Sequence, residues 1–184
     1  MRIASVLLGL LVLPSTLAPP ATVATSVPVA ASAATPMPGL SQLLLPVRGV
    51  KPTQLVDTYT QSRGAGRSHD AIDIMAPRGT PVFAVADGRV VKLFLSKPGG
   101  LTIYEFDPEE KVAYYYAHLD GYAGGLVEGK QVRRGEVIGY VGSTGNASPD
   151  GPHLHFAIFL LGPEKRWWQG TAINPFALLG GVTH

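Results

Sequence analysis

The chain has 184 residues, 46% of them hydrophobic and 15% charged, with 15 Lys and Arg against 13 Asp and Glu. This length suits one domain of ordinary size, and the nearly balanced charge gives no sign of a nucleic-acid-binding surface. The chain contains no cysteine, which excludes a disulfide scaffold, a thiolate zinc site and a cysteine nucleophile. Any transition-metal site must therefore be built from carboxylates and from the five histidines, which are His69, His118, His153, His155 and His184.

The N-terminal residues have the pattern of a secretory signal peptide. After Arg2, the apolar run from residue 3 to residue 13 makes about 17 Å of helix, too short for a hydrocarbon core of about 30 Å. We assign 1–33 to a signal peptide, with the cleavage point between 18 and 33 left open, and 34–44 to a Pro/Ala/Ser/Thr tether. An uncleaved anchor is the alternative. We therefore expect export to the periplasm, the cell envelope or the extracellular space, with no transmembrane span in the mature protein.

The remaining segment, 45–184, alternates short β-branched and aromatic runs with Gly, Pro, Asp and Asn turns. No apolar period of 3.6 residues persists over three turns, so the sequence predicts a small antiparallel all-β sandwich or barrel-like domain. The expected strands are 81–86, 89–95, 101–106, 112–118, 137–141 and 153–160.

His153 and His155 lie in the last of these strands. Side chains alternate between the two faces of a strand, so both imidazoles project to one face about 6–7 Å apart, while Leu154 and Phe156 point into the core. This spacing suits one metal ligand and one acid–base group, although a solvated pair would have the same sequence.

His69 and Asp73 can converge on one ion if the segment between them turns into a strand. Asp70 is chemically as suitable a ligand, and spacing alone does not choose between the two carboxylates. His118 stands at an expected strand end, where a rigid sheet presents reactive groups, but a buried structural histidine would look the same. The terminal His184 receives no role. Two histidines, one carboxylate and a water-filled fourth position form the ligand set of a catalytic zinc site, with two more histidines left as proton carriers.

Several blocks in order carry a resemblance to a known family over residues 57–175. The first begins at residue 66 with GRSHDAID, and APRGTPV and AVADGRV follow at residues 76 and 84. YAHL and IGYVGSTG come next, at residues 116 and 138, and GPHLHF begins at residue 151. The chain resembles the zinc-dependent peptidases of the M23 class, the LytM and lysostaphin-like enzymes that cut peptide bonds in bacterial peptidoglycan.

The resemblance implies one Zn²⁺ per chain held by His69, Asp73 and His155, with His118 and His153 assisting catalysis. It thereby selects Asp73 over Asp70. Peptidoglycan is the implied substrate, and a monomer is expected.

Some positions depart from the family pattern, two of them beside expected site residues. Ala71 replaces a common Gly between the ligands, and Ala157 replaces the Glu that usually follows HxHF. Because all five key residues are present, we expect an enzyme. The alternative is a non-catalytic LytM-like activator of a cell-wall amidase. A cupin-like metal protein is disfavoured, since no carboxylate follows HLHF before Glu164.

Candidate groove-wall residues are Tyr59, Arg63 and Tyr116, each of which has a structural or merely exposed role as its alternative. Trp167 and Trp168 either line a substrate groove or form a packed edge.

Overall fold

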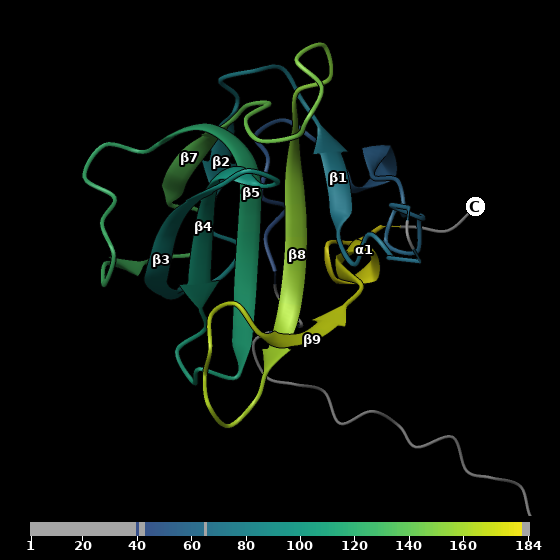
Figure 1. Ribbon diagram of the computed structural model, residues 1–184. Helices are drawn as coiled ribbons and strands as arrows, with labels where there is room; N and C mark the ends of the chain where they lie inside the picture. The colour runs from purple at the N-terminus through teal and green to yellow at the C-terminus, as the bar shows by residue number, and fades with distance from the viewer. Residues whose placement is uncertain (1–39, 41–42, 65, 182–184) are drawn as a thin grey trace, which may run out of the picture. The chain divides into compact units, whose positions relative to one another are not determined.

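Strands dominate the computed structural model, which describes residues 40, 43–64 and 66–181 (Figure 1). The expected signal peptide, 1–33, lies outside the described residues and stays a prediction, as does the position of any cleavage. Within the described ranges, no helix is long and apolar enough to cross a membrane. A single-turn helix, α1, spans Pro175–Leu178, and a 3-10 turn spans Pro52–Gln54.

The described part of the chain forms a nine-stranded antiparallel sheet. Its strands are β1 (Ile72–Met75), β2 (Pro81–Phe83), β3 (Gly88–Ser96), β4 (Gly100–Phe106), β5 (Val112–Tyr122), β6 (Gln131–Val132), β7 (Val137–Val141), β8 (His153–Leu161) and β9 (Gly170–Ile173). The main order is β1-β8-β5-β4-β3-β6, with β9 beside β8 and with a β2–β7 pair joined to β5 through β7. The predicted antiparallel all-β class is confirmed.

All six strands expected from sequence are present, but β1, β6 and β9 were not predicted. They are two to four residues long, too short to show an alternating pattern, and pairing with longer neighbours supports them. The expected strand over 81–86 ends at Phe83, while β5 continues past its expected end at residue 118 to Tyr122.

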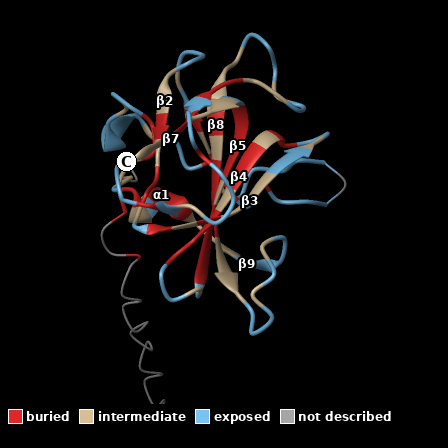
Figure 2. Ribbon diagram, turned by 90° about the vertical axis from the view of Figure 1, so that its left-hand side faces the viewer, coloured by how far each residue is buried: buried red, intermediate tan, exposed pale blue. Residues whose placement is uncertain are grey.

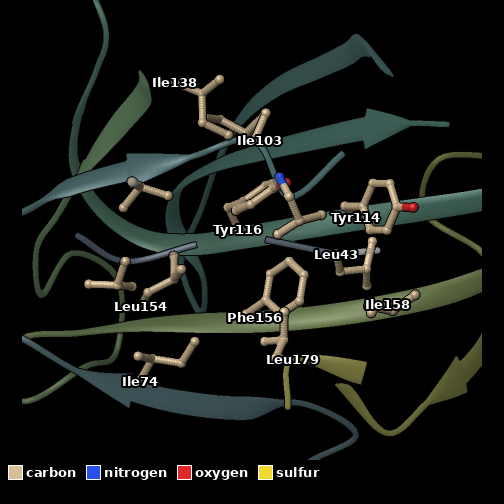
Figure 3. Packing of buried hydrophobic residues seen from close by; sticks show 14 of the residues in the cluster. Leu43, Ile74, Ile103, Tyr114, Tyr116, Ile138, Leu154, Phe156, Ile158 and Leu179 are labelled. Carbon is tan, nitrogen blue, oxygen red and sulfur yellow. The ribbon is translucent and has the colours of Figure 1, made fainter. Parts of the chain in front are cut away.

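The core lies on the sheet face opposite His153 and His155. Leu154, Phe156 and Ile158 of β8 have no exposed surface, which confirms the predicted alternation. Buried residues concentrate along β5 and β8 (Figure 2). Figure 3 shows these side chains packed with Tyr116 of β5 and Ile138 of β7.

Residues 43 and 44, directly before the predicted domain boundary at residue 45, contact the domain. Leu43 is 9% exposed and belongs to the core cluster, and the Leu44 amide donates to the Val85 carbonyl at 2.8 Å. Leu43 therefore contributes its side chain to the core, and Leu44 is joined to the domain through its backbone.

Candidate active site

Three potential ligand atoms meet where β1 lies beside the first half of β8. Asp73 is the direct antiparallel partner of His155, and His69 precedes β1 by three residues. The distance from His69 Nε2 to His155 Nδ1 is 3.0 Å, that from His69 Nε2 to Asp73 Oδ1 is 3.0 Å, and that from His155 Nδ1 to Asp73 Oδ1 is 3.1 Å. The three atoms thus form a nearly equilateral triangle.

A local turn decides which carboxylate joins this triangle. Asp70 has a φ of 54°, a left-handed conformation that Asp tolerates better than most residues. Its amide donates to the Tyr59 carbonyl, and its side chain is exposed. The turn lets His69 point inward while the chain enters β1, so Asp73 reaches the cluster and Asp70 does not.

The environment of His69 leaves one ring nitrogen available. Its Nδ1 lies 3.0 Å from the Thr58 carbonyl oxygen, which can only accept, so Nδ1 carries the hydrogen and Nε2 keeps its lone pair. Burial lowers the pKa of His69, so the ring is neutral at pH 7. A neutral imidazole with its second nitrogen bound to a carbonyl is the usual state of a metal ligand.

Asp73 is ionised. Burial alone would raise the pKa of Asp73, but hydrogen bonds from His155 and Arg63, together with the charges around it, hold that pKa well below its usual range. Arg63 donates to Asp73 Oδ2 at 2.5 Å.

A small tetrahedral ion fits these donors. Zinc with bonds of about 2.0–2.1 Å separates two of its ligand atoms by about 3.3–3.4 Å in tetrahedral geometry. The three separations of 3.0–3.1 Å are within a few tenths of an ångström of that value. Two imidazoles and one carboxylate also form a donor set of catalytic zinc sites.

His118 reaches the cluster from a β-bulge in β5. Between the pairs Leu101↔Leu119 and Ile103↔Tyr116, β5 has one residue more than β4, and His118 there has a φ of 60°. Bulges redirect side chains, and a non-glycine residue in this region is strained, which is frequent at functional sites. The His118 Nδ1 lies 2.8 Å from the Thr144 carbonyl, and burial lowers its pKa to about 4.

His153 completes the group from β8. Its Nδ1 lies 2.8 Å from the Gly151 carbonyl, and its Nε2 lies 3.7 Å from Asp73 Oδ1. The rings of His118 and His153 are 4.9 Å apart. In both histidines Nδ1 is therefore bound to a backbone carbonyl, and Nε2 is the nitrogen able to take a proton.

The four histidines and Asp73 all line one open hollow of about 420 Å³. Of the candidate wall residues, Arg63 lines it. Tyr116 does not, because it is fully buried and its hydroxyl donates to Glu105. Tyr59 is also absent from the lining, since its hydroxyl donates to the Ala172 carbonyl. For Tyr59 and Tyr116 the structural alternative therefore holds. His184 lies outside the described residues.

Sequence reasoning missed two residues of the site. Tyr115 lines the hollow, and its ring centroid is 5.9 Å from that of His155. Pairing the HLH strand against YYYAH would have found it, since Tyr115 faces Ala157 and Ala117 faces His155. Thr144, the carbonyl partner of His118, carries no sequence signal beyond a turn. Both departures from the family pattern are buried, with Ala71 at 0% and Ala157 at 1% exposure.

Comparison with known proteins gives a consistent result. The family model described as Peptidase family M23 matches residues 67–175. The DD-carboxypeptidase/endopeptidase Mpg of Neisseria meningitidis is 45% identical over 113 residues, covering 61% of this chain and 23% of that protein. The L-Ala--D-Glu endopeptidase of Bacillus subtilis is 35% identical over 117 residues, covering 60% of this chain and 36% of that protein. The match thus spans 23% of the length of the first relative and 36% of the length of the second.

The fold is also similar to that of a solved structure. The catalytic domain of lysostaphin from Staphylococcus simulans superimposes with a TM-score of 0.58 and 29% identity, over 68% of this chain and 90% of that one.

Proposed function

Because the chain belongs to peptidase family M23, we propose that it is a zinc-dependent endopeptidase that hydrolyses peptide bonds in peptidoglycan stem peptides or cross-links. The observation that carries the proposal is the triangle of His69, Asp73 and His155 donor atoms, 3.0–3.1 Å on a side, with two further imidazoles in the same hollow. Relatives are named as endopeptidases, and their activities are extended to this chain as part of the proposal.

His69, Asp73 and His155 would hold the zinc ion. The hydrogen bond to Thr58 orients His69 toward the metal position, and the ionised Asp73 supplies one negative charge against the two of the cation. The ion supplies Lewis acidity, lowering the pKa of a bound water toward 7 and polarising the scissile carbonyl.

His118 and His153 would carry protons. The lowered pKa of His118 leaves its Nε2 unprotonated at neutral pH, so this nitrogen is able to accept a proton. His153 Nε2, close to Asp73, is placed to stabilise the developing oxyanion or to pass a proton to the leaving amine. The two histidines differ in burial, but in both of them Nδ1 is bound to a backbone carbonyl. Experiment has to decide which of the two acts as the base.

The hollow suits an extended and charged peptide. It is open on one side, and Arg63 and Arg67 line it together with Ser68 and Asn146. Guanidinium groups bind carboxylates, which peptidoglycan stem peptides carry. We include export of the protein to the cell envelope in the proposal, since residues 1–33 have the signal-peptide pattern and peptidoglycan lies outside the cytoplasm.

Purified peptidoglycan digested with and without a chelator tests the proposal. Mass spectrometry of the released fragments should show new peptide termini that disappear with the chelator and with His118→Ala. Full activity after thorough chelation would overturn the role of the metal. A protein that releases nothing itself but stimulates a cell-wall amidase would be a non-catalytic activator.

A further inference from the structure

A row of aromatic rings leads away from the histidine cluster across the same face of the sheet. Tyr115 of β5, next to His155, lies 4.6 Å from Tyr104 of β4 between ring centroids. Tyr104 lies 4.8 Å from Trp167, which lies 5.2 Å from Trp168. The tryptophans belong to the segment between β8 and β9, which extends toward β4 across the lower part of β5 in Figure 1. We call Tyr115, Tyr104, Trp167 and Trp168 the aromatic row.

The far end of the aromatic row borders a second hollow, separate from the histidine cluster. Its volume is about 230 Å³, and Phe159 and Gln169 complete its lining with Tyr104 and the two tryptophans. Gly170 brings the segment close to β8, since a Cβ there would lie 2.8 Å from the Leu160 carbonyl oxygen. A side chain at position 170 would clash with β8, so the close approach that forms the hollow depends on this glycine.

This end of the row presents large apolar groups to solvent. Trp168 is 61% exposed, and Phe94, whose ring lies 5.4 Å from Trp167, is 40% exposed. Exposed apolar surface of this extent commonly marks a binding site. The prediction that the two tryptophans form a packed edge is thus correct for Trp167, which contacts Tyr104 and Phe94, but not for Trp168.

The chemistry of the hollow favours an amphipathic ring as its occupant. The two indole rings meet at 77°, forming a corner with apolar faces. Gln169 supplies amide hydrogen-bonding groups, and Arg166 lies 5.9 Å from the Trp168 ring. A pyranose has C–H groups that pack on an aromatic face and hydroxyls or amides that bind polar groups at the edge.

We propose that the corner formed by Trp167 and Trp168 binds an aminosugar of the glycan strand to which the cleaved peptide is attached. This inference rests on the proposed peptidoglycan endopeptidase function. Three ring-to-ring steps, none longer than 5.9 Å, join His155 to Trp167. An extended peptide covers about 3.3 Å per residue, so about five residues span that separation. A sugar in the corner and its attached stem peptide at the histidine cluster therefore occupy one continuous surface.

Tryptophan fluorescence tests this site directly, because Trp167 and Trp168 are the two tryptophans of the chain. The full protein is titrated with an N-acetylglucosamine tetrasaccharide, which contains no peptide bond for a peptidase to cut. We expect a saturable change in emission. Trp168→Ala should weaken binding by about tenfold, with Trp167 as the reporter, and Trp168→Phe should restore part of the affinity.

The matched control is Tyr140→Ala, which removes a 37% exposed aromatic side chain of β7 that borders neither hollow. It should bind the tetrasaccharide like the wild type. The inference fails if the emission does not respond, if Trp168→Ala binds equally well, or if only a free stem peptide or anionic vesicles change the emission. A protein that binds the sugar but cuts nothing refutes the proposed function alone, while one that cuts peptidoglycan without binding sugar refutes this inference alone.

Discussion

Asp73 shows how much of the site depends on single side chains. It lies within 3.1 Å of His69 and His155 through Oδ1, and it accepts from Arg63 through Oδ2. Arg63 lies on the carboxylate oxygen that faces away from the histidines and so helps to hold Oδ1 toward them. The two histidines, Asp73 and Arg63 therefore form one coupled hydrogen-bonded group.

Because the histidines have different proposed roles, substituting one should impair zinc binding and substituting another should impair turnover. His155→Ala removes one of three donors and should weaken zinc binding by more than about 100-fold, since losing even an outer partner costs about 10–100-fold. His118→Ala should keep one zinc per chain and lower the turnover number by about 10²–10⁴. Metal analysis of the dialysed variants, with turnover measured on the same samples, distinguishes the two.

The neighbouring carboxylate provides the control. Asp70→Asn preserves a side chain that tolerates the left-handed φ of 54° and should leave zinc affinity near the wild-type value, whereas Asp73→Asn should abolish it. Equal losses in the two variants would contradict the assignment of Asp73. The spacing in the sequence did not choose between Asp70 and Asp73, and the family resemblance selected Asp73. The turn at Asp70 supplies the physical reason.

Buried Glu105 gives the stability of the protein a specific pH dependence. Its carboxyl accepts from Tyr116 at 2.7 Å, and burial, aided by the charges of Asp87 and Glu136, raises its pKa to about 8. Between about pH 4.5 and 8 the folded protein keeps this proton while the unfolded chain loses it. The free energy of unfolding should therefore fall as pH rises through this window, by up to about 1.4 kcal/mol per pH unit.

Urea denaturation at several pH values tests this contribution. Glu105→Gln keeps the size of the side chain and should remove the downward slope relative to wild type, while the exposed Glu164→Gln should retain it. Parallel profiles for wild type and Glu105→Gln would contradict a protonated Glu105.

At the scale of the elements, a loop supports the bulge that presents His118. The Thr144 carbonyl binds His118 Nδ1, and the Thr144 hydroxyl donates to the Leu119 carbonyl and accepts from the Leu101 amide. The sequence predicted the strand that became β5, but not that the loop at Thr144 meets it, because hydrogen bonds between segments 25 residues apart leave no local pattern.

Gly145 allows this loop to approach β4. It has a φ of 75°, and a Cβ would lie 2.3 Å from the Gly100 amide nitrogen and 2.4 Å from the Pro98 carbonyl oxygen. Gly145→Ala should cost more than about 2 kcal/mol in unfolding free energy and also lower turnover, since His118 loses its anchor. Gly124→Ala, where nothing lies within 4 Å of a Cβ, should be nearly neutral. Equal unfolding midpoints for the two variants would contradict the account.

At the scale of the whole molecule, the longer strands and the core face were predictable because β8 alternates so clearly. The same alternation placed His153 and His155 together on the other face. The short strand β1 was not predictable from its four residues, although it brings Asp73 opposite His155. The second hollow could not be predicted from the sequence either, because it depends on a loop that crosses β5 to reach Tyr104.

The central claim is that one zinc ion in the histidine–aspartate cluster makes this domain a peptidase. The most direct measurement titrates zinc into the metal-stripped protein while recording both bound metal and the rate of peptide release from purified peptidoglycan. We predict that the rate rises from near zero and reaches its maximum at one equivalent, in parallel with bound metal. A rate already at its maximum in the stripped protein, or one that stays at zero with one zinc bound, would contradict the claim.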